Sequence, residues 1–203
     1  MHPTATDYTW FDELFSGDLA EAYCLTVALR LSPEEYLRRL DAEVTGRWEG
    51  VAGMADHALE IEGRSFVAVT LCESALGPAV LAVEPNGYLG VTEDVMATVS
   101  AGTTAVSHFR NINWLDGFLW TEDGRIRLRF EPYLSSECVG SVPDELVAQM
   151  RESGFDLRPG LSDEELGPYS AAAFALAERI GGVRVTPDLL AGSAYLCGTV
   201  RSR

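Results

Sequence analysis

Arginine and aromatic side chains alternate around one short turn in the middle of the chain, and interface hot spots favour both residue types. The dipeptide Asp123-Gly124 predicts a hairpin with a two-residue turn. With that turn, Trp120 faces Arg127 and Phe118 faces Arg129, and all four side chains share one face of the hairpin. We therefore expect an Arg/aromatic sheet face that binds a partner.

The preceding strand extends this surface with three polar residues, His108, Arg110 and Asn111. An arginine over an aromatic ring contributes about 0.5–1 kcal/mol at an exposed site. The expected ligand is another protein or a small anionic molecule. The opposing interpretation is that the hairpin residues form ordinary cross-strand pairs on a hydrated face, or lie under the C-terminal helices.

Metal and nucleophile chemistry finds little support in the residue spacing. The three histidines, His2, His57 and His108, form no H-x-x-x-H pattern, and no cysteine lies within four residues of any of them. We therefore predict no metal site and no cofactor. The four cysteines are widely spaced and are expected to be structural thiols, although a Cys72–His108 pair is chemically conceivable.

Two glutamates stand where general acids and bases are often held. Glu84 and Glu131 each precede a proline at the end of an expected strand. The simpler interpretation is that both are turn residues. The alternative function built on them is a small-molecule enzyme of bacterial secondary metabolism, with a pocket near His108 and Glu84. The acidic run 163–165 lacks the ligand pattern of a calcium loop and is expected to be a solvated linker.

The local patterns place strands first and helices later. Ser32-Pro33-Glu34-Glu35 combines an N-cap, a proline at the first helical position and the glutamate of a capping box, so a helix begins there. Thr92 is expected to cap a second helix to about residue 100, and 44–56 is expected to be a loop. Strands are predicted over 23–31, 58–61, 66–72, 79–84, 103–110, 118–121 and 125–130.

Beyond residue 132 the pattern is helical. Helices are expected over 141–154, from a cap at Ser170, and from Thr186 toward Gly198, with an exposed linker at 156–168. This order predicts an α+β fold, in which a largely antiparallel sheet carrying the Asp-Gly hairpin is capped by C-terminal helices. We expect a single domain over 1–203, with the mixed sheet in 20–132 and the helical part in 141–200.

Composition excludes several function classes. The formal net charge is −16, and all 15 basic residues are arginine. Without lysine the chain cannot form a P-loop or a Schiff base, and its acidity argues against nucleic-acid binding. The apolar runs are far shorter than the roughly 20 residues that span a bilayer, and the first residues lack a signal-peptide pattern. We therefore expect a cytoplasmic protein with no membrane partner.

Seven short stretches of the chain carry a further signal: 10–12, 22–26, 31–35, 84–90, 106–111, 173–179 and 197–200. These stretches resemble a family of uncharacterised actinobacterial, Streptomyces-type proteins that carries only a domain-of-unknown-function label. The resemblance implies a cytoplasmic bacterial protein of one continuous domain, and it supplies no catalytic residue or ligand. Together with the acidity, which suits a protein that masks a basic partner, it favours a non-enzymatic binding or regulatory module, of the immunity-protein kind.

Overall fold

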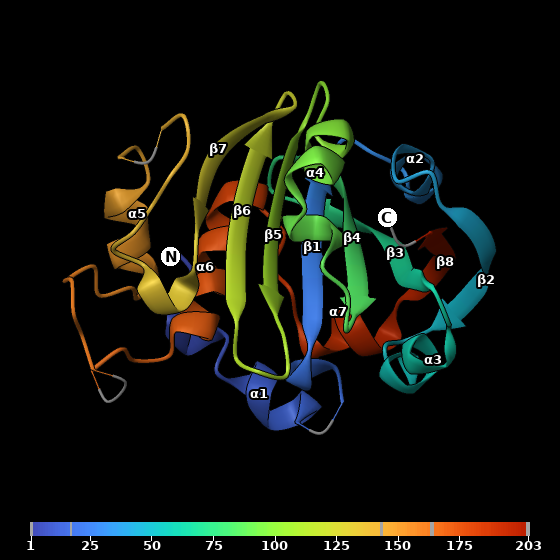
Figure 1. Cartoon of the computed structure of the whole chain (residues 1–203), viewed down its shortest axis with the longest axis horizontal. Coiled ribbons are helices and arrows are strands. Elements are labelled where there is room, and N and C mark those ends of the chain that lie inside the picture. Colours follow the sequence, from blue (N-terminus) through green and yellow to red (C-terminus); the bar gives the residue numbers. More distant parts are fainter. Residues whose placement is uncertain (1, 17, 143, 163–164, 202–203) are drawn as a thin grey trace.

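A computed structural model describes residues 2–16, 18–142, 144–162 and 165–201. One antiparallel sheet of eight strands runs through it, in the order β2-β8-β3-β4-β1-β5-β6-β7 (Figure 1). This architecture confirms the predicted α+β fold. The strands are β1 (Tyr23–Leu29), β2 (Glu43–Glu49), β3 (Arg64–Ser74), β4 (Gly77–Pro85), β5 (Thr104–Arg110), β6 (Asp116–Glu122), β7 (Arg125–Phe130) and β8 (Ala194–Arg201).

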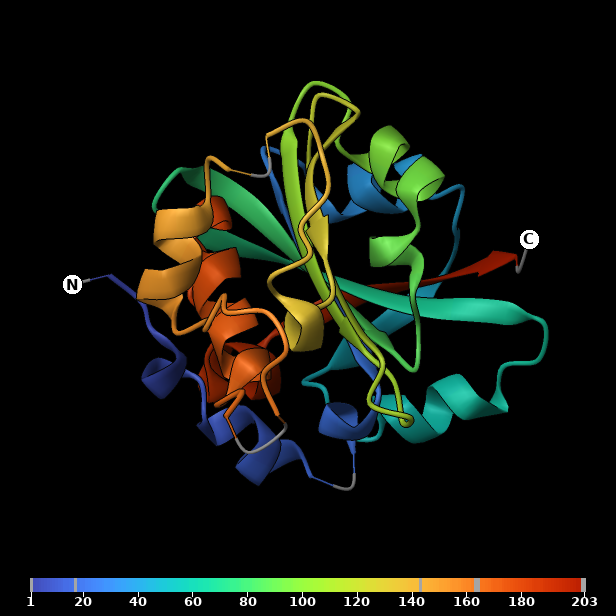
Figure 2. The ribbon, with the colours of Figure 1, turned by 60° about the vertical axis from the view of Figure 1, so that its left-hand side comes forward.

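Helices cover both faces of the sheet, so the central strands are apolar on both sides (Figures 1 and 2). The longest helix, α6, packs against β1 and β5 on one face, and α2 and α4 lie on the other. We call these the α6 face and the α4 face. The helices are α1 (Trp10–Phe15), α2 (Pro33–Arg39), α3 (Met54–Glu60), α4 (Glu93–Val99), α5 (Val147–Ser153), α6 (Tyr169–Gly181) and α7 (Pro187–Gly192).

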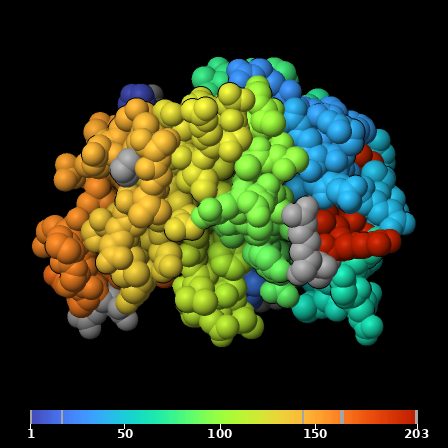
Figure 3. All heavy atoms as spheres, turned by 45° about the horizontal axis from the view of Figure 1, so that its top comes forward, coloured from blue at the N-terminus to red at the C-terminus, as the bar shows by residue number. Residues whose placement is uncertain are grey.

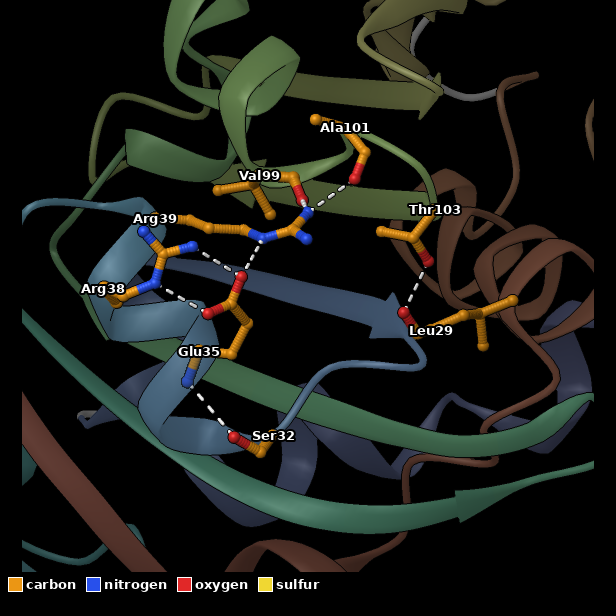
Figure 4. A network of polar contacts seen from close by, with 8 residues as sticks. All are labelled: Leu29, Ser32, Glu35, Arg38, Arg39, Val99, Ala101 and Thr103. Atoms are coloured by element: carbon orange, nitrogen blue, oxygen red, sulfur yellow. Dashed lines mark hydrogen bonds and ion pairs between the residues drawn. The ribbon is translucent and has the colours of Figure 1, made fainter.

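At the start of α2, the predicted N-cap is present but the predicted capping box is not. The Ser32 hydroxyl accepts a hydrogen bond from the backbone N–H of Glu35 at 3.2 Å, which confirms the cap (Figure 4). The Glu35 carboxylate does not complete the capping box, because it binds Arg38 and Arg39 instead. Arg39 also donates to the carbonyls of Val99 and Ala101 at 2.7 Å, which fixes α2 beside the end of α4.

Two segments between α2 and β3 differ from expectation. The stretch 44–56 is not a loop, because most of β2 and the start of α3 fall within it. The residues 58–61 do not form a strand, because α3 continues through Glu60. β2 is an edge strand whose residues are almost all exposed, so it lacks the alternating apolar pattern that reveals a strand.

The C-terminal part also needs correction. Thr186 caps α7 as expected, but the chain then enters β8, which pairs with both β2 and β3. The predicted helix toward Gly198 is therefore wrong. Ser170 does not cap α6, because it lies within the helix. The helix α5 begins only at Val147, and residues 143, 163 and 164 of the predicted helix start and acidic run lie outside the described residues.

The Asp123-Gly124 turn is present, but its register holds for only two pairs. Glu122 faces Arg125 and Thr121 faces Ile126, and the register then shifts at a β-bulge, so that Trp120 faces Leu128 and Phe118 faces Phe130. The extra residue in the bulged strand is Arg127, and a two-residue turn alone does not reveal such an insertion. Within the described residues, no helix is long and apolar enough to cross a membrane.

Candidate functional site

The turn between β5 and β6 lies at one end of the sheet (Figure 1). It exposes three large apolar side chains. Ile112 is 69% exposed, Trp114 is 65% exposed and Leu115 is 59% exposed. We call residues 111–115 the apolar turn. Turns are ordinarily polar, because apolar groups gain nothing from facing water, so three exposed apolar residues within one short turn mark a candidate contact surface.

Hydrogen bonds within the apolar turn hold it in one conformation. The Asn111 side-chain oxygen accepts hydrogen bonds from the backbone N–H groups of Asn113, at 2.9 Å, and Leu115, at 3.1 Å. The backbone N–H of Asn111 also donates a hydrogen bond to the Leu115 carbonyl at 2.9 Å. Trp114 adopts a φ of 62°, which is uncommon for a bulky residue and requires such support.

A buried arginine lies directly beneath this turn. The guanidinium carbon of Arg110 is 5.1 Å from the Trp114 ring centre and 5.4 Å from the Tyr23 ring centre. Its nitrogens donate to Asp12 at 2.5 Å, to Ser170 at 3.3 Å and to the Ala20 carbonyl. Arg110 therefore joins the apolar turn to β1, α1 and α6.

His108 and Asp116 are two further titratable groups near Arg110 on the α6 face. The Tyr23 hydroxyl lies 3.2 Å from Nδ1 of His108, while His108 Nε2 has no hydrogen-bond partner in the described structure. Burial, assisted by the positive charge of Arg110, lowers the pKa of His108 to about 3, so His108 is neutral at physiological pH. Burial, with the negative charge of Glu131 adding to it, raises the pKa of Asp116 to about 7.

The predicted binding residues do not form one surface. Phe118, His108 and Arg110 are buried, and Asn111 is half-buried within the apolar turn. Trp120 and Arg127 are half-buried on the α6 face, where the guanidinium carbon of Arg127 lies 5.4 Å from the Trp120 ring centre. The bulge explains the separation, because it turns Arg129 to the α4 face, where it pairs with Glu93.

The pocket expected near His108 and Glu84 is not shared by these two residues. Along β1, Leu25 is opposite His108, whereas the adjacent Cys24 is opposite Glu84. Successive residues of a strand point to opposite faces, so His108 and Glu84 lie on opposite sides of the sheet. The Cys72–His108 pair is also excluded, because β4 and β1 lie between the strands that carry the two residues.

Glu84 has a structural role on the α4 face. Its carboxylate is fully buried and accepts hydrogen bonds from the backbone N–H groups of Leu89, at 2.8 Å, and Gly90, at 3.0 Å. Burial raises the pKa of Glu84 to about 7, against the lowering effect of these two hydrogen bonds. Glu84 therefore anchors the 3-10 turn η3 (Leu89–Val91) to the sheet, in keeping with the simpler interpretation of this residue.

The cysteines are free thiols in the described structure, and three of the four are buried. Mainly because of burial, the thiols of Cys72, Cys138 and Cys197 have pKa values raised to about 11. These thiols are therefore poor nucleophiles at neutral pH. Among the described residues, no group of three histidine, cysteine or carboxylate side chains is placed to hold a metal ion.

Sequence reasoning missed Ile112, Trp114 and Leu115. A signal for them was present, because three apolar residues within five positions separate two strands at a place where turn residues are expected. The sequence pattern predicted a binding surface on the hairpin instead, because arginine recurs there at every second residue.

No curated protein and no solved structure matches the chain. A family model matches residues 1–203, so the chain belongs to the family described as "Family of unknown function (DUF6461)".

Proposed function

We propose that this protein is a non-enzymatic, cytoplasmic binding or regulatory module that docks on another protein through the apolar turn. One observation carries the proposal. Trp114 is 65% exposed, yet it is held in a left-handed backbone conformation over a buried arginine. A strained and exposed indole persists only when surrounding contacts enforce it, and such residues concentrate at functional sites.

The rigidity of the apolar turn supports a docking role. Binding requires ordering of interface side chains and loops, and a preorganised loop reduces that entropic cost. The hydrogen bonds of Asn111 and the contact with Arg110 fix the turn before any partner arrives. Tryptophan is among the residues most enriched at binding hot spots.

The negative net charge of the protein supports the proposal that its partner is basic. The net charge of −16 would attract a basic protein from a distance and would raise the association rate at low salt. A module that masks a basic surface, as immunity proteins do, fits this charge. The free thiols support a reducing compartment such as the cytoplasm.

A small anionic ligand has less support than a protein. Each arginine proposed to hold an anion already contacts a carboxylate. Arg110 contacts Asp12, Arg127 contacts Glu122 and Glu145, and Arg129 contacts Glu93. An anion would have to compete with these carboxylates for the guanidinium groups.

Site-specific photo-crosslinking in living cells of the source organism tests the proposal. A photoreactive phenylalanine analogue replaces Ile112 in one variant and Leu76 in the control, because Leu76 is 55% exposed at the opposite end of the sheet. We expect position 112 alone to label a basic protein. With that protein purified, Trp114→Ala should weaken binding about tenfold or more, whereas Leu76→Ala should not. Equal labelling from both positions, or unchanged affinity of Trp114→Ala, contradicts the proposal.

A further inference from the structure

A cleft of about 520 Å³ opens where η3 approaches β6, β7 and the segment that follows β7. Figure 3 shows the surface of β7 and the following segment, in yellow, meeting that of α4, in green. The volume falls within the range of small-molecule sites. Its lining includes Val91, Phe109, Gly117 and Leu119 from the sheet and η3, together with residues of 129–139.

The floor of the cleft is apolar and lacks one side chain. Gly117 lies in the interior of β6, and its φ is not in the left-handed region, so the backbone does not require glycine here. A Cβ at this position would meet Val91 at 3.6 Å and Phe109 at 3.7 Å, which are ordinary contact distances. A glycine that neither the backbone nor packing demands leaves room beside Phe109 for another molecule.

The polar part of the cleft is acidic. Glu131 and Glu137 are exposed, and among the described residues no basic side chain lies within ion-pair distance of either. Asp116 also belongs to the lining, but it is only 7% exposed, and alternation along β6 places its side chain on the α6 face, away from Gly117. The one basic residue of the lining, Arg129, is paired with Glu93.

We infer that this cleft binds an organic cation with an apolar body, such as an ammonium or guanidinium group on an aliphatic or aromatic carrier. The apolar body lies on Val91 and Phe109 over Gly117, and the cation faces Glu131 and Glu137. Charge complementarity excludes an anion, because unpaired carboxylates would repel it. The inference does not depend on the apolar turn, because no residue of that turn lines the cleft. The cation can be a free amine or a basic side chain of a protein.

Three probes of nearly equal shape separate charge from shape. We would titrate the purified protein, by NMR of its backbone amides, with phenethylamine, 2-phenylethanol and 3-phenylpropionate. We expect the amine to perturb the amides of residues 117–119 and 129–139, and to bind about tenfold or more tightly than the alcohol. The carboxylate should not bind. Equal binding of the amine and the alcohol, or binding of the carboxylate, overturns the inference.

Variants of the lining provide the second test. Gly117→Val should abolish amine binding, because its branched side chain fills the floor, and the NMR spectrum reports whether the variant is folded. If Gly117→Val does not fold, Gly117→Ala, which meets only ordinary contacts, should still weaken binding. The double variant Glu131→Gln/Glu137→Gln should bind the amine and the alcohol equally. Unchanged amine affinity in both the glycine and the glutamate variants overturns the inference.

A peptide probe distinguishes a free amine from a basic side chain of a protein as the source of the cation. N-acetyl-Phe-Arg-amide presents the same chemistry as part of a protein chain. Tighter binding of this peptide than of phenethylamine assigns the cleft to a basic side chain, and the reverse assigns it to a free amine. Leu76→Ala is the control, because Leu76 lies outside both the cleft lining and the apolar turn, so this variant should leave the affinity for both probes unchanged. Since no residue of the apolar turn lines the cleft, the two proposals can fail separately.

Discussion

The guanidinium carbon of Arg110 lies 5.1 Å from the ring centre of Trp114, so a buried cation supports an exposed indole. The same guanidinium contacts the N-terminal region through Asp12 and the helix α6 through Ser170. The conformation of the apolar turn is therefore linked to the packing of segments far away in sequence.

The first prediction concerns this arginine. Arg110→Leu should lower the free energy of unfolding by about 2–4 kcal/mol, because it removes a buried guanidinium and leaves its acceptors unsatisfied. The fluorescence of Trp114 should shift, since the indole loses the group beneath it. The control is Arg129→Leu, whose exposed ion pair should contribute less than about 1 kcal/mol. Equal losses in the two variants by chemical denaturation would show that Arg110 has no special role.

Several elements were predictable because their cause is local. Ser32 and Thr186 cap helices through hydroxyl groups that lie next to the N–H groups they accept from. The Asp123-Gly124 turn follows from the two residues that form it. Such features depend on a few neighbouring residues, so the sequence contains their whole explanation.

The features that escaped prediction depend on distant segments. β8 forms a strand because β2 and β3 lie on either side of it, and its sequence alone also fits a helix. The bulge at Arg127 displaces half of the predicted Arg/aromatic sheet face. His108 and Arg110 are polar residues that the sequence assigns to a surface, but α6 and the N-terminal segment cover them.

The second prediction concerns the cap of α2. Ser32→Ala should lower the free energy of unfolding by about 1 kcal/mol, because the N–H of Glu35 loses its acceptor. Thr92→Ala is the matched control at the start of α4. The Thr92 hydroxyl makes no capping bond and instead donates to the Tyr88 carbonyl at 3.0 Å. A smaller loss for Ser32→Ala than for Thr92→Ala in urea denaturation would contradict the capping role.

The third prediction concerns Trp120, which was expected to lie on a free binding face. It packs partly against the α6-face core, so Trp120→Ala should lower stability by about 2–4 kcal/mol, somewhat less than for a fully buried tryptophan. Arg127→Gln should change stability by less than about 1 kcal/mol, because its ion pairs are long and its carboxylate partners are well exposed. A thermal melt in which Trp120→Ala is neutral would restore the exposed-face hypothesis.

The fourth prediction is a pH dependence that arises from Glu84. Its pKa in the folded state is about 7, above the ordinary value of 4.5, so the folded protein binds more protons than the unfolded chain between these values. Its contribution to stability is therefore fully present below pH 4.5 and is lost as the pH rises through 7. Relative to the wild type, Glu84→Gln should gain about 2–3 kcal/mol between pH 4.5 and pH 8.

Urea denaturation of both proteins at a series of pH values measures this difference. Glu73→Gln, which removes an exposed carboxylate from the neighbouring strand, is the control. A stability difference between wild type and Glu84→Gln that stays constant from pH 4.5 to pH 8 would show that Glu84 ionises normally in the folded protein.

The last prediction compares two glycines that have ordinary φ values but different surroundings. At Gly90, a Cβ would overlap with Thr26 Oγ1 and would lie 2.7 Å from Cys24 Sγ, so η3 would have to move away from the sheet. That movement would also weaken the hydrogen bonds from Leu89 and Gly90 to the Glu84 carboxylate. Gly90→Ala should therefore lower stability by about 2 kcal/mol or more. At Gly192, near the end of α7, the added Cβ would meet no other part of the described structure within 4 Å, and alanine should stabilise the helix by about 0.5–1 kcal/mol. Opposite signs in a denaturant titration are expected, and a neutral Gly90→Ala would mean that η3 is not held tightly against the sheet.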